Sequence, residues 1–168
     1  MSAPLCVLVG MMGAGKTTVG RLVADRLGLP FRDVDADIEA SAGKPISDIF
    51  IDDGEEHFRA LEQAAIAEAL DGFHGVLAVG GGAILAEETR KRLADQRVVY
   101  LSVELPDALR RVGLGAGRPV LAMNPRATLR HLLDQRRPLY KEVATVVVPT
   151  DGRTPEEVAA DVTAALTS

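Results

Sequence analysis

A glycine-rich octapeptide near the start of the chain, Gly10 to Thr17 (GMMGAGKT), lies between an apolar run and a helical pattern. The apolar run covers residues 5–9 and the helical pattern covers residues 16–27. This strand–loop–helix context is the one in which a phosphate-binding P-loop works, because backbone N–H groups gather there at the positive end of a helix. The octapeptide therefore predicts that a polyphosphate binds at the first strand–helix junction.

The loop residues divide the binding of a nucleoside triphosphate between them. Its glycines permit backbone angles and close approaches that a side chain would block. Lys16 can reach the β- and γ-phosphates, and Thr17 can offer its hydroxyl to Mg²⁺. We expect ATP with Mg²⁺ to contact this segment through Gly13, Ala14, Gly15, Lys16, Thr17 and Thr18.

Composition narrows the class of protein. At 168 residues, with 47% hydrophobic and 26% charged residues, the chain fits one domain that spans 1–168. Its apolar runs are strand-sized, and residues 1–4 carry no basic segment, so we expect neither a membrane span nor a secretory signal. The net charge of −5 argues against nucleic-acid binding. A single cysteine, Cys6, predicts a buried thiol in a reducing, cytoplasmic compartment.

Apolar strand-like runs alternate with helical patterns along the whole chain. The runs predict strands at residues 5–9, 30–33, 76–79, 98–102 and 145–148. Helices are expected at residues 16–27, 36–42, 46–52, 54–70, 86–94, 106–112, 126–143 and 155–166. This alternation predicts an α/β fold with a parallel sheet covered on both faces, whose ligands bind beyond the carboxyl ends of the strands.

Two stretches interrupt the alternation. The first is a helical insertion at about residues 34–60. The second, residues 113–124, has three glycines in five residues followed by Arg118, which predicts a mobile lid. An arginine on such a lid can close over a phosphoryl group in transfer.

Two carboxylates follow the second predicted strand. In an extended chain Asp33 and Asp35 point to one side, so both can face the triphosphate. Asp33 is the better placed to hold Mg²⁺, while Asp35 can accept a proton from an attacking hydroxyl. The alternative is that Asp35 or Asp37 only caps the next helix.

Further candidate residues follow in the insertion and after the third predicted strand. Glu55, Arg59 and Glu62 share one helix face, either as a solvated salt-bridge ladder or as a site where Arg59 holds a substrate carboxylate and Glu62 orients it. Three consecutive glycines, Gly80, Gly81 and Gly82, would let a ligand lie against the backbone.

The late arginines point to a small anionic ligand. Arg136 and Arg137 are adjacent on a predicted helix, so only one of them can face the site. Arg111 and Arg153 are placed to border an adenine ring, with a plain surface position as the alternative. The three histidines show no metal-ligand spacing and are expected to be structural or solvated.

Taken together, these elements resemble the shikimate kinase family over nearly the whole chain. The matching segments are GMMGAGKT at 10–17, DVDADIE at 33–39, FRALE at 58–62, GGG at 80–82, RPVL at 118–121 and RRPLY at 136–140. The resemblance implies a three-layer P-loop kinase fold with the strand order 2-3-1-4-5. It also implies ATP-dependent phosphorylation of the shikimate 3-hydroxyl, on the route to the aromatic amino acids.

The resemblance also implies a role for each matching residue. Lys16 and the lid residue Arg118 bind phosphate, and Thr17 and Asp33 serve the metal. Asp35 contacts the shikimate hydroxyls, Arg59 and Arg136 bind the carboxylate, and Glu62 positions Arg59. Gly80, Gly81 and Gly82 line the pocket, with an N–H offered by Gly82, and Arg111 and Arg153 flank the base. Val120 stands where the family more often has leucine.

Two other interpretations stay open at this level. A gluconate kinase would share the P-loop and the parallel sheet, but the set of Asp35, Arg59, Gly80–Gly82 and Arg136 suits a cyclic polyol carboxylate better. A nucleotide-binding module without activity would be expected to lack Lys16, Asp35 or Arg118, and all three are present. The resemblance implies a monomer.

Overall fold

Five parallel strands form the centre of the molecule. The computed structural model describes residues 3–112 and 124–167, and its strands pair in the order β2-β3-β1-β4-β5. The bounds are β1 (Cys6–Val9), β2 (Phe31–Asp33), β3 (Val76–Ala78), β4 (Val98–Ser102) and β5 (Val146–Pro149). The expected fold class and strand order are confirmed.

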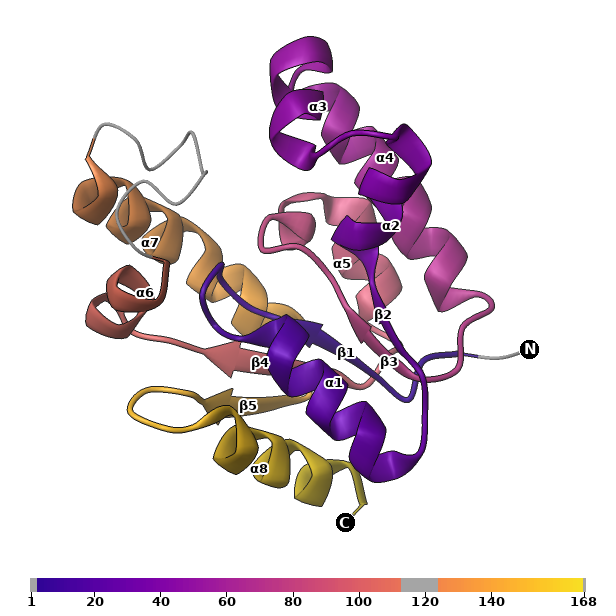
Figure 1. Cartoon of the computed structure of the whole chain (residues 1–168), viewed down its shortest axis with the longest axis vertical. Coiled ribbons are helices and arrows are strands. Elements are labelled where there is room, and N and C mark those ends of the chain that lie inside the picture. Colours follow the sequence, from indigo (N-terminus) through magenta and orange to yellow (C-terminus); the bar gives the residue numbers. More distant parts are fainter. Residues whose placement is uncertain (1–2, 113–123, 168) are drawn as a thin grey trace.

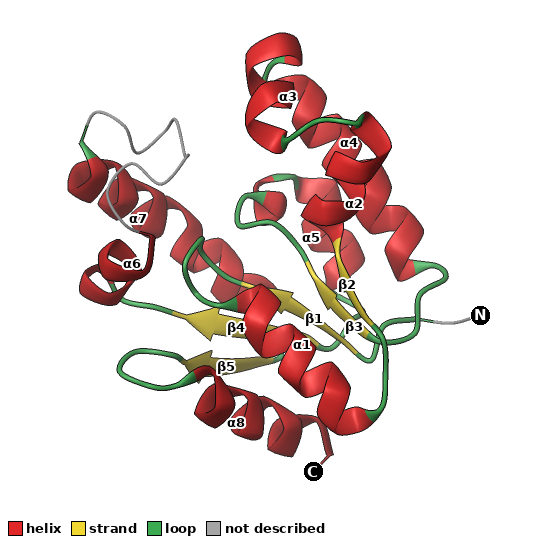
Figure 2. Ribbon diagram, viewed as in Figure 1, coloured by secondary structure: helices red, strands yellow, loops and turns green. Residues whose placement is uncertain are grey.

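Helices connect the strands and cover both faces of the sheet. Figures 1 and 2 show α1 and α8 on one face, where they pack against each other, and α5 and α7 on the other. The helices are α1 (Lys16–Leu27), α2 (Val34–Ala42), α3 (Ile46–Asp53), α4 (Glu55–Leu70), α5 (Glu87–Leu93), α6 (Leu105–Val112), α7 (Pro125–Val143) and α8 (Pro155–Thr167). Covering on both faces explains why the strands are almost continuously apolar.

The core lies between the sheet and these two helix layers. All four residues of the central strand β1 are fully buried, Cys6 among them. Burial raises the pKa of the Cys6 thiol to about 12, so it stays protonated at neutral pH. The expectation of a buried, structural thiol is confirmed.

Two local features differ from the expectations. Helix α2 begins at Val34, directly after β2, whereas the sequence pattern placed its start at residue 36. Asp33 ends β2 and caps α2, because its side chain accepts a hydrogen bond from the Asp35 N–H at 3.0 Å. A short 3₁₀ helix, η1 (Ala83–Leu85), follows the glycines after β3 and was not expected.

The helical insertion lies beyond the end of β2. Helices α2 and α3 and the first turn of α4 extend from this edge of the sheet (Figure 1). Within residues 3–112 and 124–167, no helix has both the length and the apolar content needed to cross a membrane. The lid expected at 113–124 lies outside the described residues except for Asn124, whose side chain caps α7 by accepting from the Ala127 N–H at 3.2 Å.

Candidate active site

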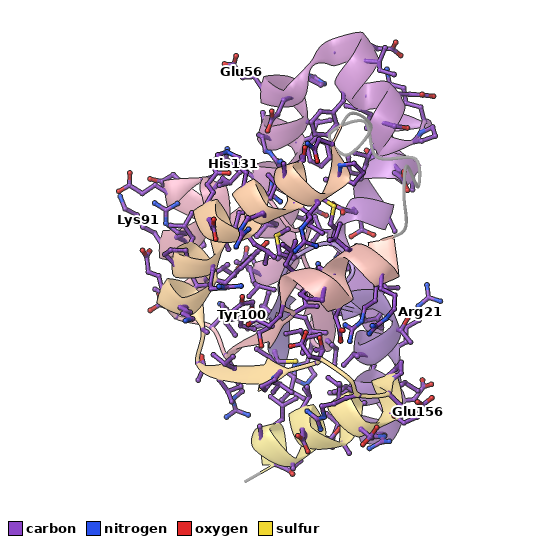
Figure 3. All side chains as sticks on the ribbon, turned by 90° about the vertical axis from the view of Figure 1, so that its left-hand side faces the viewer. Arg21, Glu56, Lys91, Tyr100, His131 and Glu156 are labelled. Carbon is purple, nitrogen blue, oxygen red and sulfur yellow. The ribbon has the colours of Figure 1, made fainter. Side chains whose placement is uncertain are left out.

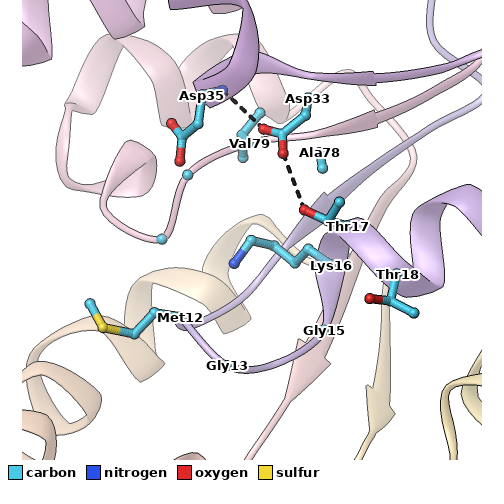
Figure 4. Close-up of a pocket in the computed structure, with 12 residues that line it drawn as sticks. Met12, Gly13, Gly15, Lys16, Thr17, Thr18, Asp33, Asp35, Ala78 and Val79 are labelled. Carbon is cyan, nitrogen blue, oxygen red and sulfur yellow. Dashed lines mark hydrogen bonds between the residues drawn. The ribbon is translucent and has the colours of Figure 1, made fainter. Parts of the chain in front are cut away.

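A pocket of about 230 Å³ opens at the carboxyl ends of β1, β2 and β3. Parallel α/β sheets bind their ligands at this edge. Three segments that are distant in sequence meet there (Figure 4). The lining residues are Met12, Gly13, Gly15, Lys16, Thr17, Thr18, Asp33, Asp35, Ala78, Val79, Gly80 and Gly81.

The P-loop forms one wall of this pocket. Gly10 has a φ of 152°, and a Cβ at that position would lie 2.6 Å from the backbone oxygen of Leu101 on β4. Gly15 has a φ of 92° and serves as the N-cap of α1 without a side-chain cap, which leaves the first N–H groups of the helix for a ligand. The Lys16 ammonium donates to the carbonyls of Gly10 and Met11 at 2.7 and 3.1 Å.

Thr17 and Asp33 form the oxygen-rich part of the pocket. The Thr17 hydroxyl donates to Asp33 Oδ2 at 3.1 Å, and Asp33 Oδ1 accepts from the Asp35 N–H (Figure 4). The capping alternative for Asp35 and Asp37 is therefore wrong, because Asp33 caps the helix. The extended geometry expected for Asp35 is also wrong, since Asp35 lies in the first turn of α2, although both carboxylates still line the pocket.

Asp37 lies in the same helical turn but serves another contact. Its carboxylate pairs with the guanidinium of Arg32. It does not line the pocket beside the P-loop. The structure therefore separates Asp35, which lies in the pocket, from Asp37, which lies outside it.

Each of the three glycines after β3 leaves space for a different side chain. A Cβ on Gly80 would lie 2.8 Å from Glu62 Oε2 and 2.9 Å from Asp35 Oδ1. A Cβ on Gly81 would lie 3.5 Å from Arg136 Nη1, and one on Gly82 would overlap the Arg59 guanidinium. The missing side chains thus let four charged groups from α2, α4 and α7 approach one short segment.

Arg59 reaches this segment from α4 with a carboxylate on either side. Its guanidinium donates to Glu62 Oε1 at 2.9 Å and lies 3.4 Å from Glu55 Oε2. The Glu55 side chain is 61% exposed and that of Glu62 only 3%, so only one end of the ladder is solvated. The ion pairs of the ladder are therefore present, but only one end is solvated, and the role of Arg59 at a substrate carboxylate remains a prediction.

Burial shifts the pKa of the Glu62 carboxyl group. Desolvation raises the pKa of its carboxyl, and the nearby Arg59 guanidinium offsets part of that rise. The negative charge of Asp35 raises the pKa further, while Arg136 lowers it. In the described part of the chain, Glu62 Oε2 has no hydrogen-bond partner.

Arg136, and not its neighbour, faces the site. Arg136 is 7% exposed, and its Nε has no hydrogen-bond partner among the described residues. Arg137 instead pairs with Glu104 at 3.2 Å in a more exposed position. Buried polar groups in proteins are almost always hydrogen-bonded, so the guanidinium of Arg136, with its Nε unpartnered and its Nη1 beside Gly81, indicates where an anionic ligand would bind.

Tyr140 also reaches this segment, a contact that the sequence pattern does not predict. It is fully buried on α7, and its hydroxyl donates to the Gly81 carbonyl. The available signal was the helical spacing, since Tyr140 lies four residues after Arg136 and therefore on the same face. That spacing alone does not distinguish a loop contact from an ordinary core tyrosine.

The two arginines expected near the adenine ring occupy different surroundings. Arg111 donates to the Gly13 carbonyl at 3.3 Å and to the Thr150 hydroxyl at 2.9 Å, so it lies against the P-loop. Arg153 turns toward α8, where it pairs with Asp161 at 2.7 Å. The roles of both at a base remain predictions, as does that of Arg118, which lies outside the described residues.

The histidines lie away from this pocket. All three are exposed, and His131 projects from the outer side of α7 (Figure 3). Among residues 3–112 and 124–167, no group of three or more His, Cys, Asp or Glu side chains is arranged to hold a metal ion. A metal at this site would depend on Thr17, Asp33 and the oxygens of a bound phosphate.

Comparison with known proteins gives one consistent family. The family model described as shikimate kinase matches residues 12–167. The shikimate kinase of Salinispora arenicola is 68% identical over 98% of this chain and 98% of its own length.

Solved structures agree with that match. The shikimate kinase of Acinetobacter baumannii, solved in complex with shikimate, superposes with a TM-score of 0.93 at 38% identity, over 99% of this chain and 94% of its own. A gluconokinase from Sinorhizobium meliloti superposes with a TM-score of 0.61 at 24% identity, over 96% of this chain and 90% of its own. The second likeness concerns the fold alone.

Proposed function

The chain belongs to the shikimate kinase family and is an ATP-dependent phosphotransferase, and we propose how its residues divide the reaction between them. The 3-hydroxyl oxygen of shikimate attacks the γ-phosphorus of ATP in line with the departing oxygen of ADP. One P–O bond forms as the other breaks, and the products are shikimate 3-phosphate and ADP. Catalysis is mainly positioning and charge neutralisation.

The nucleotide half of the site is the P-loop wall. The N–H groups at the start of α1 and the Lys16 ammonium hold the phosphates, along Gly13, Ala14, Gly15, Thr17 and Thr18. Lys16 now donates to two carbonyls of its own loop, so it already lies where a γ-phosphate would compete for it. Arg111, which contacts the Gly13 carbonyl, and Arg153 border the base, and Arg118 closes over the phosphates from the lid at 113–124.

Thr17 and Asp33 fit a magnesium ion. Their oxygens are joined by a hydrogen bond at the mouth of the P-loop, and hydroxyl and carboxylate oxygens are the donors that Mg²⁺ prefers. Mg²⁺ bound there would neutralise charge on the phosphates. The few protein ligands match an ion that retains much of its water shell.

The acceptor half of the site carries the choice of substrate. Arg59 and Arg136 bind the shikimate carboxylate, and Glu62 holds Arg59 in place through the 2.9 Å bond to Nη1. The observation that supports this assignment is the Arg136 guanidinium, whose buried Nε has no hydrogen-bond partner among the described residues and whose Nη1 lies beside Gly81. A carboxylate is the ligand that completes such an arginine.

Asp35 faces the transferred group from the first turn of α2. It lines the pocket opposite the P-loop, next to Gly80 (Figure 4). We propose that the Asp35 carboxylate accepts the proton of the shikimate 3-hydroxyl as the P–O bond forms. Because the transition state of phosphoryl transfer is loose, orienting the hydroxyl is as important as removing its proton.

These roles belong to a monomeric, cytoplasmic enzyme of one domain, with residues 34–60 as the acceptor-binding unit. The buried, protonated Cys6 supports the reducing compartment. A second chain is not required, because the P-loop, the carboxylates after β2 and the glycines after β3 of one chain line the pocket together. Sedimentation of the purified protein with and without ATP and shikimate tests the monomer.

The decisive assay couples ADP release to the acceptor. With ATP and Mg²⁺, we expect turnover that depends on shikimate and does not occur with gluconate. Removal of Mg²⁺ with a chelator should abolish it. Correctly folded protein without shikimate-dependent ADP release, or with equal turnover on gluconate, would overturn the proposal.

A further inference from the structure

The hydroxyl of Tyr140 contacts the one peptide group that joins Gly81 to Gly82. Tyr140 is fully buried on α7, and its hydroxyl donates to the Gly81 carbonyl oxygen. Gly81 also lies against the P-loop, since a Cβ there would be 3.4 Å from both Gly10 O and Met12 N. The Tyr140 hydroxyl therefore holds a peptide group that lies between the P-loop and the residues proposed to bind the acceptor.

This contact determines the direction of a neighbouring donor. No peptide bond among the described residues is cis, and in a trans peptide the carbonyl and the next N–H point in opposite directions. Holding the Gly81 carbonyl toward Tyr140 therefore turns the Gly82 N–H away from it. That N–H donates to no group in residues 3–112 and 124–167, and Gly82 is buried against the Arg59 guanidinium, directly after two glycines that line the pocket.

A peptide group between two glycines has no strongly preferred orientation. Glycine adopts positive and negative φ with similar ease, so rotation of the Gly81–Gly82 peptide is opposed by little steric cost. The chain downstream is held separately, because Arg90 donates to the carbonyls of Ile84 and Leu85 at 2.8 and 3.1 Å. The peptide itself is held by the Tyr140 hydroxyl.

We propose that Tyr140 is a positioning residue that selects the orientation of the Gly81–Gly82 peptide and so presents the Gly82 N–H to the acceptor. The inference rests on the proposed function, because the acceptor is shikimate bound by Arg59 and Arg136. It adds a residue that touches neither substrate. Through the same peptide, Tyr140 also fixes the Gly82 position against which the Arg59 guanidinium packs.

The surroundings keep this hydroxyl in place and protonated. The Tyr140 ring stacks on Tyr100 of β4, with ring centroids 5.0 Å apart and 28° between the planes, and both residues are buried. Burial raises the pKa of Tyr140 well above its ordinary range, so the hydroxyl stays a donor at any working pH. A phenylalanine at 140 would keep the stack and lose the hydroxyl, which contacts both the Gly81 carbonyl and the Arg136 guanidinium.

The test compares Tyr140→Phe with Tyr100→Phe, which removes a hydroxyl from the other ring of the same stack. We expect Tyr140→Phe to raise the KM for shikimate about fivefold to tenfold, the effect of one lost hydrogen bond, with the KM for ATP unchanged. In ¹⁵N-labelled protein the amide resonance of Gly82 should move in Tyr140→Phe and stay in place in Tyr100→Phe. Urea unfolding confirms that both variants fold.

Three results would overturn the inference. The first is a shikimate KM and a Gly82 amide that are the same in the two variants. The second is an equal rise in the KM for ATP, which would indicate a distorted P-loop. The third, measured on wild-type protein, is a Tyr140 hydroxyl proton that exchanges rapidly with water. If the wild type releases no ADP with shikimate, the proposed function fails, and the Gly82 amide still decides the orientation of the peptide.

Discussion

The guanidinium of Arg59 occupies the space that a side chain on Gly82 would need. Arg59 comes from α4 and Gly82 from the segment after β3, so the two meet only in the folded chain. Gly82 has a φ of −97°, an angle that any residue can adopt. The close approach of the Arg59 guanidinium, and not the backbone conformation, therefore explains why residue 82 is a glycine. The position of the Arg59 guanidinium thus depends on the absence of one methyl group.

Gly82→Ala should displace this guanidinium while the fold is kept, because the obstructing atoms are the far end of a flexible side chain. We expect the KM for shikimate to rise about tenfold, with little change in the KM for ATP, since a hydrogen-bonded ion pair with the carboxylate is lost. Steady-state kinetics measures both constants. Gly72→Ala is the matched control, because a Cβ there meets nothing closer than 3.9 Å. Equal effects in the two variants would contradict this explanation.

Asp35→Asn should lower kcat far more than it weakens ATP binding. A general base contributes roughly 10²–10⁴ in rate, and a role in orientation alone would cost less. The control is Asp37→Asn, which changes a carboxylate in the same turn of α2 that pairs with Arg32 outside the pocket. Single-turnover rates and the dissociation constant for ATP are compared. An equal loss in rate and in ATP affinity would refute the assigned role.

Arg136→Ala should weaken the binding of shikimate and leave the binding of ATP unchanged. A lost charged hydrogen bond is worth about 1.5–3 kcal/mol, which corresponds to roughly a ten- to hundredfold rise in the KM for shikimate. Arg137→Ala changes the adjacent arginine, whose partner is Glu104 outside the pocket, and should leave this KM within about twofold. An unchanged KM for shikimate in Arg136→Ala would show that Arg136 does not bind shikimate.

Glu62 should make the ligand-free protein less stable as the pH rises. Its folded-state pKa is raised from the ordinary value of 4.5 by burial, so the folded protein holds this proton more tightly than the unfolded chain. The stabilisation is present below pH 4.5 and is lost as the pH rises through the raised pKa. Glu62→Gln cannot ionise at this position. The free energy of unfolding of this variant should therefore rise relative to that of the wild type between pH 5 and pH 8.

Urea titrations over that range measure the difference. Glu62→Gln should also raise the KM for shikimate, because Arg59 loses the carboxylate that holds it. Glu55→Gln, which removes the exposed partner of Arg59, should change stability by less than about 1 kcal/mol at every pH. A wild type that becomes more stable relative to Glu62→Gln as the pH rises would show that the ion pair outweighs the burial.

Much of the fold could be predicted because its signals are local. The P-loop, the apolar strands and the helical patterns each depend on neighbours within a few residues, and the parallel order followed from their alternation and the family resemblance. The ends of elements were less certain. Helix α2 began two residues early, since the Asp33 side chain both ends a strand and caps a helix, which residue preferences alone do not reveal.

By itself, the sequence determined the chemistry: a phosphate-binding loop, carboxylates and glycines at the strand ends, and arginines for an anionic acceptor. Only the tertiary structure decided which of these residues meet. Arg136 was separated from Arg137, Arg153 turned toward α8, and Tyr140 was found on the Gly81 carbonyl. The reason is physical, because a motif depends on spacing along the chain, whereas the contacts of a side chain depend on the packing of helices and strands far apart in sequence.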